Sequence, residues 1–236
     1  MIPGEVAVWA HDYLFAARMH LRGNLDPRPP ALNGPPGARV HVVLIPGVVE
    51  RWPFMEPLGR RLAAAGMGVH FVPELGRNLA PVLESVPVVA RVVDQVAAAH
   101  PAAKIVLVAH SKGGLIGKRL MVDRALHPEQ PQPTGLVALA TPFAGSSRSW
   151  MVRGAAIREF DPSNAMLRAL AAERSADARI HVVLPRIDPH VPGNEVPAGM
   201  QGVRMRASGH FRPLATAEAA QAVLRAIDAL TKDRAR

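Results

Sequence analysis

The chain has 236 residues, no cysteine and a formal net charge of +9, from 28 Lys and Arg against 19 Asp and Glu. This length suits one α/β domain, and the lack of cysteine excludes disulfides, thiolate metal sites and a cysteine nucleophile. The arginines are dispersed and no basic run alternates with aromatic residues, so we expect no nucleic-acid partner. The charge favours a solvated basic surface, with weak contact to an anionic membrane surface or an acidic substrate as a milder alternative.

The N-terminal segment predicts an amphipathic helix over residues 5–22. Its apolar residues at helical spacing are Val6, Trp9, Tyr13, Leu14, Ala17 and Leu21. We expect this helix to pack on the domain, and the alternative is a helix on a membrane surface or against a partner. The start of the chain does not resemble a secretory signal, and no segment has the roughly 18 uninterrupted apolar residues of a membrane span. A cytoplasmic protein is therefore expected.

Apolar runs alternate with segments of helical periodicity after a Gly- and Pro-rich loop at residues 23–38. The predicted strands are residues 40–45, 69–72, 105–109, 135–140, 180–184 and 202–206, the last at a sheet edge. The predicted helices are about 58–65, 85–99 with Pro87 in its first turn, 112 to about 126, and 215–232. This alternation implies a parallel sheet with helices on both faces. Active sites of such sheets lie beyond the carboxyl ends of the strands, so residues directly after strands are candidates.

The strand at residues 105–109 ends in an abrupt turn at a serine. The run Ala109-His110-Ser111-Lys112-Gly113 precedes residues at helical spacing, which is the strand–serine–helix outline of a nucleophile elbow. Side chains two before and two after the serine lie close to neighbouring backbone, so glycine is best there and alanine is the next smallest choice. Ser111 is therefore the candidate nucleophile.

Two backbone N–H groups are candidates for binding a negative oxygen beside Ser111. One belongs to Lys112, which follows the nucleophile at a helix N-terminus, where the helix dipole favours negative charge. The second is expected in the loop after the first strand, where Gly47 lets the chain turn with its amides inward. We assign it to Val48, with Val49 next in line.

A histidine and a carboxylate follow the last two strands and are the candidate base and acid. His210 lies on the loop before the closing helix and is the predicted base. Asp188 follows the strand at residues 180–184 and is the predicted acid, which gives the order Ser…Asp…His. The alternatives are His190 as base, although it is only two residues from Asp188, and Asp161 as acid, although it looks like a helix cap.

Together, these motifs resemble an α/β-hydrolase of the small bacterial lipase and esterase kind. The Ala-His-Ser-Lys-Gly-Gly elbow is similar to that of small bacterial lipases. The stretch from Thr141 to Ser146 resembles the family's T-P-H-x-G-S, with Phe143 in place of histidine. Residues 188–192 resemble its D-x-x-V-P acid loop and residues 209–211 its histidine loop. The resemblance covers most of residues 40–232 and implies a three-layer α/β-hydrolase fold with about six mostly parallel strands, in one domain over residues 1–236.

The resulting hypothesis is a serine hydrolase that cleaves a small-molecule acyl ester through an acyl-enzyme, with no metal or cofactor required. Residues 143–176 predict a small lid or cap. The side chains predicted to line an acyl pocket, or alternatively to pack in the core, are Val49, Phe143, Trp150, Met151 and Phe160. A thioesterase or acyltransferase with the same triad is an alternative. A hydrolase-fold protein that only binds a ligand is disfavoured, because all three triad positions are filled.

Overall fold

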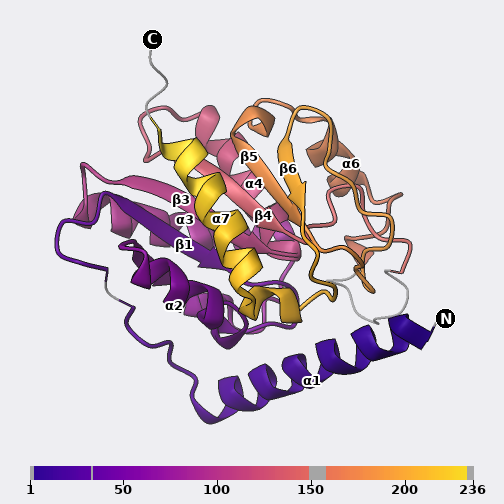
Figure 1. Ribbon diagram of the computed structural model, residues 1–236. Coiled ribbons are helices and arrows are strands. Elements are labelled where there is room, and N and C mark those ends of the chain that lie inside the picture. The colour runs from indigo at the N-terminus through magenta and orange to yellow at the C-terminus, as the bar shows by residue number, and fades with distance from the viewer. Residues whose placement is uncertain (1–2, 33, 149–157, 233–236) are drawn as a thin grey trace.

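The computed structural model describes residues 3–32, 34–148 and 158–232, and within them the strands form one six-stranded parallel sheet (Figure 1). The strand order is β2-β1-β3-β4-β5-β6, and every neighbouring pair is parallel. The strands are β1 Val40–Ile45, β2 Gly68–Phe71, β3 Lys104–His110, β4 Gly135–Leu139, β5 Ile180–Leu184 and β6 Gln201–Arg204. The predicted parallel α/β architecture is confirmed, with β6 at one edge as expected.

Helices cover both faces of the sheet because alternate residues of each strand point to opposite sides. The helices are α1 Pro3–Leu25, α2 Glu56–Ala64, α3 Val82–Ala99, α4 Lys112–Ala125, α6 Ala165–Ala172 and α7 Ala217–Thr231. On β3, Ile105 and Leu107 belong to a core shared with α3, α4 and α6. Val106 and Val108 belong to a second core shared with α2 and α7. The domain therefore has three layers, with the sheet in the middle.

Helix α3 begins three residues earlier than its periodicity predicted, so the expectation that Pro87 lies in its first turn is wrong. The earlier start is possible because a backbone N–H group of the first turn has a hydrogen-bond acceptor. The Val82 N–H donates to the Glu159 carboxylate at 3.1 Å, which satisfies an end group that would otherwise lack an acceptor. Pro87 then lies inside the helix, where it omits one backbone hydrogen bond.

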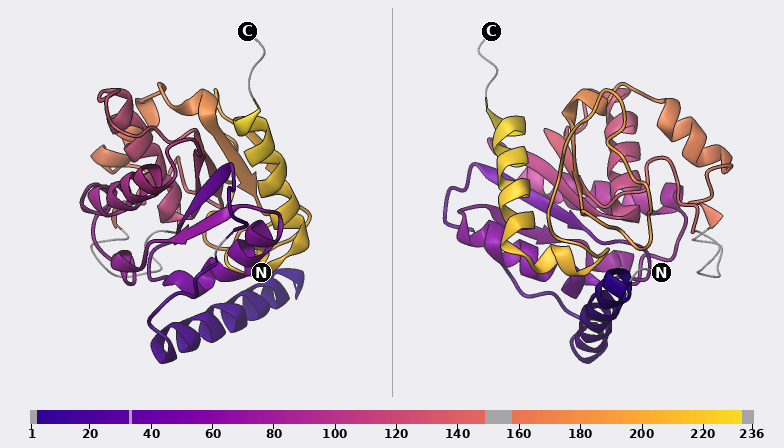
Figure 2. Two further views of the ribbon diagram at one scale, coloured as in Figure 1. Left: turned by 90° about the vertical axis from the view of Figure 1, so that its left-hand side faces the viewer. Right: turned by 45° about the vertical axis from the view of Figure 1, so that its right-hand side comes forward.

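Helix α1 lies along one end of the molecule, outside the two helical layers (Figures 1 and 2). It packs against two 3-10 turns, η1 Trp52–Phe54 and η5 Arg212–Ala215. Ala16 joins the core below it and is 5% exposed. None of the helices in the described part of the chain combines the length and the apolar character needed to cross a membrane.

Candidate active site

The serine elbow has the strained backbone that its sequence predicted. Ser111 follows β3 directly and has φ 51° and ψ −121°, a conformation that residues other than glycine rarely adopt. Glycine is required at the two positions after Lys112 because atoms of neighbouring strands and loops lie where a Cβ would be. A Cβ on Gly113 would lie 2.5 Å from the Ile45 carbonyl oxygen, and one on Gly114 would lie 2.0 Å from Thr141 Oγ1. The elbow is thus fitted against the ends of both neighbouring strands, β1 and β4.

Ser111, His210 and Asp188 form one chain of hydrogen bonds. The Nε2 atom of His210 lies 3.0 Å from Ser111 Oγ. Its Nδ1 atom lies 2.9 Å from Asp188 Oδ2. All three side chains are buried. The structure therefore brings the predicted nucleophile, base and acid together in the order that proton transfer from serine requires.

Burial and neighbouring charges shift the pKa values of His210 and Asp188 in opposite directions. Burial by itself would lower the pKa of His210, but the carboxylates of Asp188, Glu50 and Asp12 outweigh it and raise that pKa above its usual 6.5. Burial would raise the pKa of Asp188, yet His210 and two backbone N–H donors lower it below 3.8. A buried neighbour, His190, has its pKa lowered to about 3 by burial and by the charge of His210. His190 therefore stays neutral, and the ionised Asp188 favours a proton on His210.

The two backbone N–H groups assigned to the oxyanion lie beside Ser111. Val48 and Val49 line the same cavity as Ser111, and Val49 has φ 66°, a strained value for a β-branched residue. Within the described residues, neither the Val48 N–H nor the Lys112 N–H has a protein acceptor. Both N–H groups are therefore free to donate a hydrogen bond to a negative oxygen.

The side chain of Lys112 is buried and turns toward the loop before α3. Its Nζ donates to the carbonyl oxygens of Asn78, at 3.1 Å, and Ala80. Burial lowers the pKa of this amine to about 8. Lys112 thus offers the candidate site its backbone N–H, and its charged group is used elsewhere.

A cavity of about 350 Å³ opens over Ser111 and is mostly apolar. Val49 and Phe160, two of the predicted pocket residues, line it. Phe143 does not: it is 5% exposed, packs in the core beneath α4 and α6, and lines a neighbouring cavity. The predicted Trp150 and Met151 lie outside the described residues. Helix α1 contributes four lining residues that were not predicted to belong to the pocket, namely Tyr13, Ala16, Ala17 and His20.

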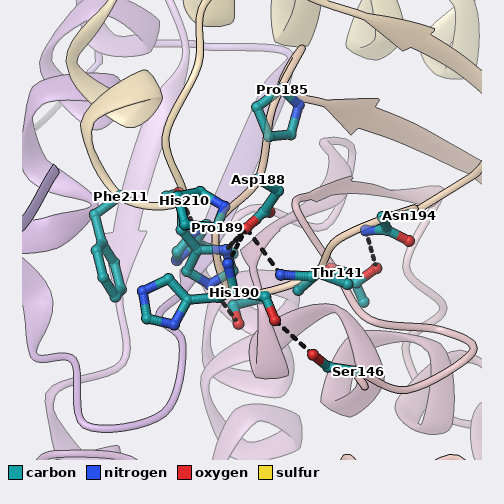
Figure 3. A network of polar contacts seen from close by, with 12 residues as sticks. Thr141, Ser146, Pro185, Asp188, Pro189, His190, Asn194, His210 and Phe211 are labelled. Carbon is teal, nitrogen blue, oxygen red and sulfur yellow. Dashed lines mark hydrogen bonds and ion pairs between the residues drawn. The ribbon is translucent and has the colours of Figure 1, made fainter. Parts of the chain in front are cut away.

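The Asp188 loop is fixed by its own backbone and by the loop after β4 (Figure 3). The N–H of His190 donates to Asp188 Oδ1 at 2.8 Å. Ser146 Oγ donates to the His190 carbonyl oxygen, and Asn194 Nδ2 donates to the Thr141 carbonyl oxygen at 3.1 Å. Asp188 is therefore held in place by contacts that do not involve His210. The alternative acid, Asp161, is exposed and accepts hydrogen bonds from Ser163 instead. Asn164, rather than Asp161, caps α6.

Solved structures share this arrangement of sheet and helices at low sequence identity. A metagenomic carboxyl esterase is 15% identical with a TM-score of 0.62, over 88% of this chain and 80% of that chain. An α/β serine hydrolase without a lid from Xanthomonas campestris is 16% identical with a TM-score of 0.59, over 86% and 89%. A monoacylglycerol lipase from Paleococcus ferrophilus is 18% identical with a TM-score of 0.55, over 84% and 96%. The chain has the α/β-hydrolase fold. No protein-family model matches the chain, and no curated protein is similar to it in sequence.

Within this α/β-hydrolase fold, the buried pair Glu50–His110 links the loop after β1 to the histidine loop, and the sequence did not predict it. His110 Nδ1 lies 2.8 Å from Glu50 Oε1, and His110 Nε2 donates to the His210 carbonyl oxygen at 2.9 Å. The Gly47 N–H donates to Glu50 Oε2 at 2.6 Å. The sequence signal that could have indicated this pair was the position of Glu50, three residues after Gly47 in the loop that follows β1.

A third buried carboxylate, Asp12 of α1, contacts the same histidine loop of the α/β-hydrolase fold. It accepts hydrogen bonds from the backbone N–H groups of His210, Phe211 and Arg212. Asp12 is 1% exposed. The only sequence signal for Asp12 is that a carboxylate lies within a mostly apolar predicted helix.

Proposed function

We propose that the protein is a serine hydrolase that cleaves carboxylic esters of apolar acyl groups. The observation that carries this proposal is the hydrogen-bonded chain Ser111–His210–Asp188 at the base of an apolar cavity. The similarity to esterases and lipases in fold is consistent with it, although one fold supports many reactions.

In the proposed reaction, Ser111 Oγ attacks the ester carbonyl carbon while His210 Nε2 takes the hydroxyl proton. Asp188 stabilises the imidazolium that forms, and the N–H groups of Val48 and Lys112 bind the negative oxygen of the tetrahedral intermediate. Collapse of this intermediate breaks the bond to the alcohol, which leaves with the proton from His210. Water then attacks the acyl-enzyme with His210 as base, releasing the acid and restoring Ser111.

The size and lining of the cavity support the proposal that it holds the acyl group of the substrate. Its volume is near the lower end of the roughly 300–1,000 Å³ found for small-molecule sites, and apolar side chains form most of its wall. The described parts of residues 143–176 contribute Ser146, Arg148 and Phe160 to this wall, which supports a cap at that segment. Helix α1 contributes Tyr13, Ala16, Ala17 and His20 to the same wall.

A fluorophosphonate probe tests the proposed function directly, because it phosphonylates only an activated serine. We expect one adduct, located at Ser111 by mass spectrometry, and a labelling rate reduced by roughly 10³-fold or more in His210→Ala. A folded wild-type protein that does not label would contradict the proposal. Once labelling is seen, a screen of matched esters and thioesters of increasing chain length separates an esterase from a thioesterase.

We also propose that helix α1 brings this site to an anionic lipid surface. Five of the nine exposed large apolar side chains in the described part of the chain lie on α1. They are Val6, Tyr13, Leu14, Leu21 and Leu25. The exposed Arg18 lies on the same helix, and the chain as a whole is basic. Apolar contact and attraction to anionic lipids act together in such helices.

Vesicle sedimentation measures this contact. The wild type is expected to bind anionic vesicles less strongly at about 1 M salt, where the Debye length is near 3 Å. The double variant Leu14→Glu/Leu21→Glu is expected to lose binding but to keep its turnover of a soluble short-chain ester, because neither leucine lines the cavity. Leu126→Glu, at a more exposed site after α4 and away from α1, is the control. Wild-type protein that stays in the supernatant would contradict the proposal.

A further inference from the structure

The histidine loop is held from two sides by side chains that lie far from it in the sequence. From α1, Asp12 Oδ2 accepts the His210 N–H at 2.8 Å, and Oδ1 accepts the Phe211 and Arg212 N–H groups at 2.8 Å each. From the end of β3, His110 Nε2 donates to the His210 carbonyl oxygen. The backbone N–H and carbonyl groups of His210 are therefore both held by hydrogen bonds. Asp188 then has only to fix the rotation of the His210 ring.

The fit between Asp12 and this loop is close. Gly209 has φ 117°, and a Cβ at this position would lie 2.5 Å from Asp12 Oδ1. The loop thus bends around the carboxylate in a conformation that favours glycine. Hydrogen bonds to an ionised acceptor are stronger than those between neutral groups, and here water does not compete because Asp12 is 1% exposed.

We propose that Asp12 is a positioning residue for the hydrolysis: its carboxylate holds the histidine loop so that His210 Nε2 stays within hydrogen-bond distance of Ser111. It is not a catalytic residue, because it contacts only backbone. This inference rests on the proposed function. The competing explanation is that Asp12 serves only to attach α1 to the domain.

The charge of Asp12 gives a signature that attachment alone does not produce. The carboxylates that raise the pKa of His210 are those of Asp188, Glu50 and Asp12, and the rings of His110 and His190 also face it. Removing one carboxylate shifts the pH at which His210 becomes an effective base to lower values. Loosening α1 at a distant contact leaves that pH unchanged.

The test compares Asp12→Asn, which keeps the side-chain shape, with Arg22→Ala. Arg22 lies on the same helix and pairs with Glu56 at 2.7 Å, away from the histidine loop. We expect Asp12→Asn to lower kcat by about 10²-fold with little change in KM, because a displaced base weakens only the transition state. We expect its acidic pH limb to move to lower pH. Arg22→Ala, compared at equal fraction folded, is expected to keep the wild-type kcat and pH limb.

Amide hydrogen exchange gives a readout that does not depend on activity. The N–H groups of His210, Phe211 and Arg212 are expected to exchange faster in Asp12→Asn and at the wild-type rate in Arg22→Ala. The proposal is overturned if these amides keep their protection, or if kcat and the pH limb of Asp12→Asn match those of Arg22→Ala. Wild-type protein without serine labelling would overturn the proposed function and the positioning role with it. The exchange rates would then still report whether Asp12 holds the loop.

Discussion

Asp188→Asn is expected to lower kcat/KM for an ester by roughly 10³- to 10⁴-fold, because a neutral amide neither stabilises the His210 imidazolium nor enforces a proton on Nδ1. The pH profile should change as well. Only the neutral His210 ring can take the serine proton, so activity rises with pH through its pKa. That pKa is raised above 6.5 in the wild type, against the lowering effect of burial. Without the Asp188 charge, burial dominates and the limb moves to lower pH.

Steady-state kinetics on a soluble ester between about pH 5 and 9 measure both effects, which lie in the range where histidine titrates. Asp161→Asn is the matched control, because Asp161 was the alternative acid and is exposed with Ser163 as its partner. It is expected to keep the wild-type rate and profile. Equal losses in the two variants, or a loss confined to Asp161→Asn, would contradict the assignment of Asp188.

The largest effect on stability is expected at a buried ion pair away from the site. Lys118 Nζ lies 2.8 Å from Asp177 Oδ1, and the two side chains are 1% and 5% exposed. Arg174 pairs with the other oxygen of Asp177 at 2.5 Å. Asp177→Ala leaves the Lys118 ammonium buried without its counter-charge. It should lower the free energy of unfolding by about 3–5 kcal/mol.

Urea unfolding with linear extrapolation measures this change. Asp123→Ala is the control, because Asp123 and Arg119 form an i,i+4 pair whose side chains are 34% and 41% exposed. It is expected to cost less than about 0.5 kcal/mol. Similar small losses in both variants would contradict the expected cost of leaving the Lys118 side chain without Asp177.

Most of the sheet was predictable from sequence because β1, β3, β4 and β5 are almost wholly buried, whereas the edge strand β6 is exposed. Val40–Ile45 and Ile180–Leu184 have the structural bounds that their apolar runs predicted. Helix starts were less predictable. The first turn of α3 depends on Glu159, a residue 77 positions from Val82, and contacts at such a distance leave no periodic pattern in the sequence.

The same distinction separates the site residues. The sequence could predict that Ser111, Asp188 and His210 lie together because a parallel sheet brings the residues after its strands to one edge. Asp12 and the pair Glu50–His110 were not found, because their roles arise from side chains that meet only in the folded chain. Phe143 was assigned to the pocket from its position after β4, but the loop turns its ring into the core.

The bond between Asp12 and His210 also has a consequence for synthesis. The two residues are 198 positions apart, so at about 5–20 residues per second the ribosome needs roughly 10–40 s between them. Until His210 is made, Ser111 has no base, and α1 has no docking site at η5. The proposed hydrolase therefore cannot act on esters while it is still a nascent chain. During the same interval the face of the amphipathic helix α1 that packs on η5 stays uncovered, and we expect chaperones that bind nascent chains to recognise it.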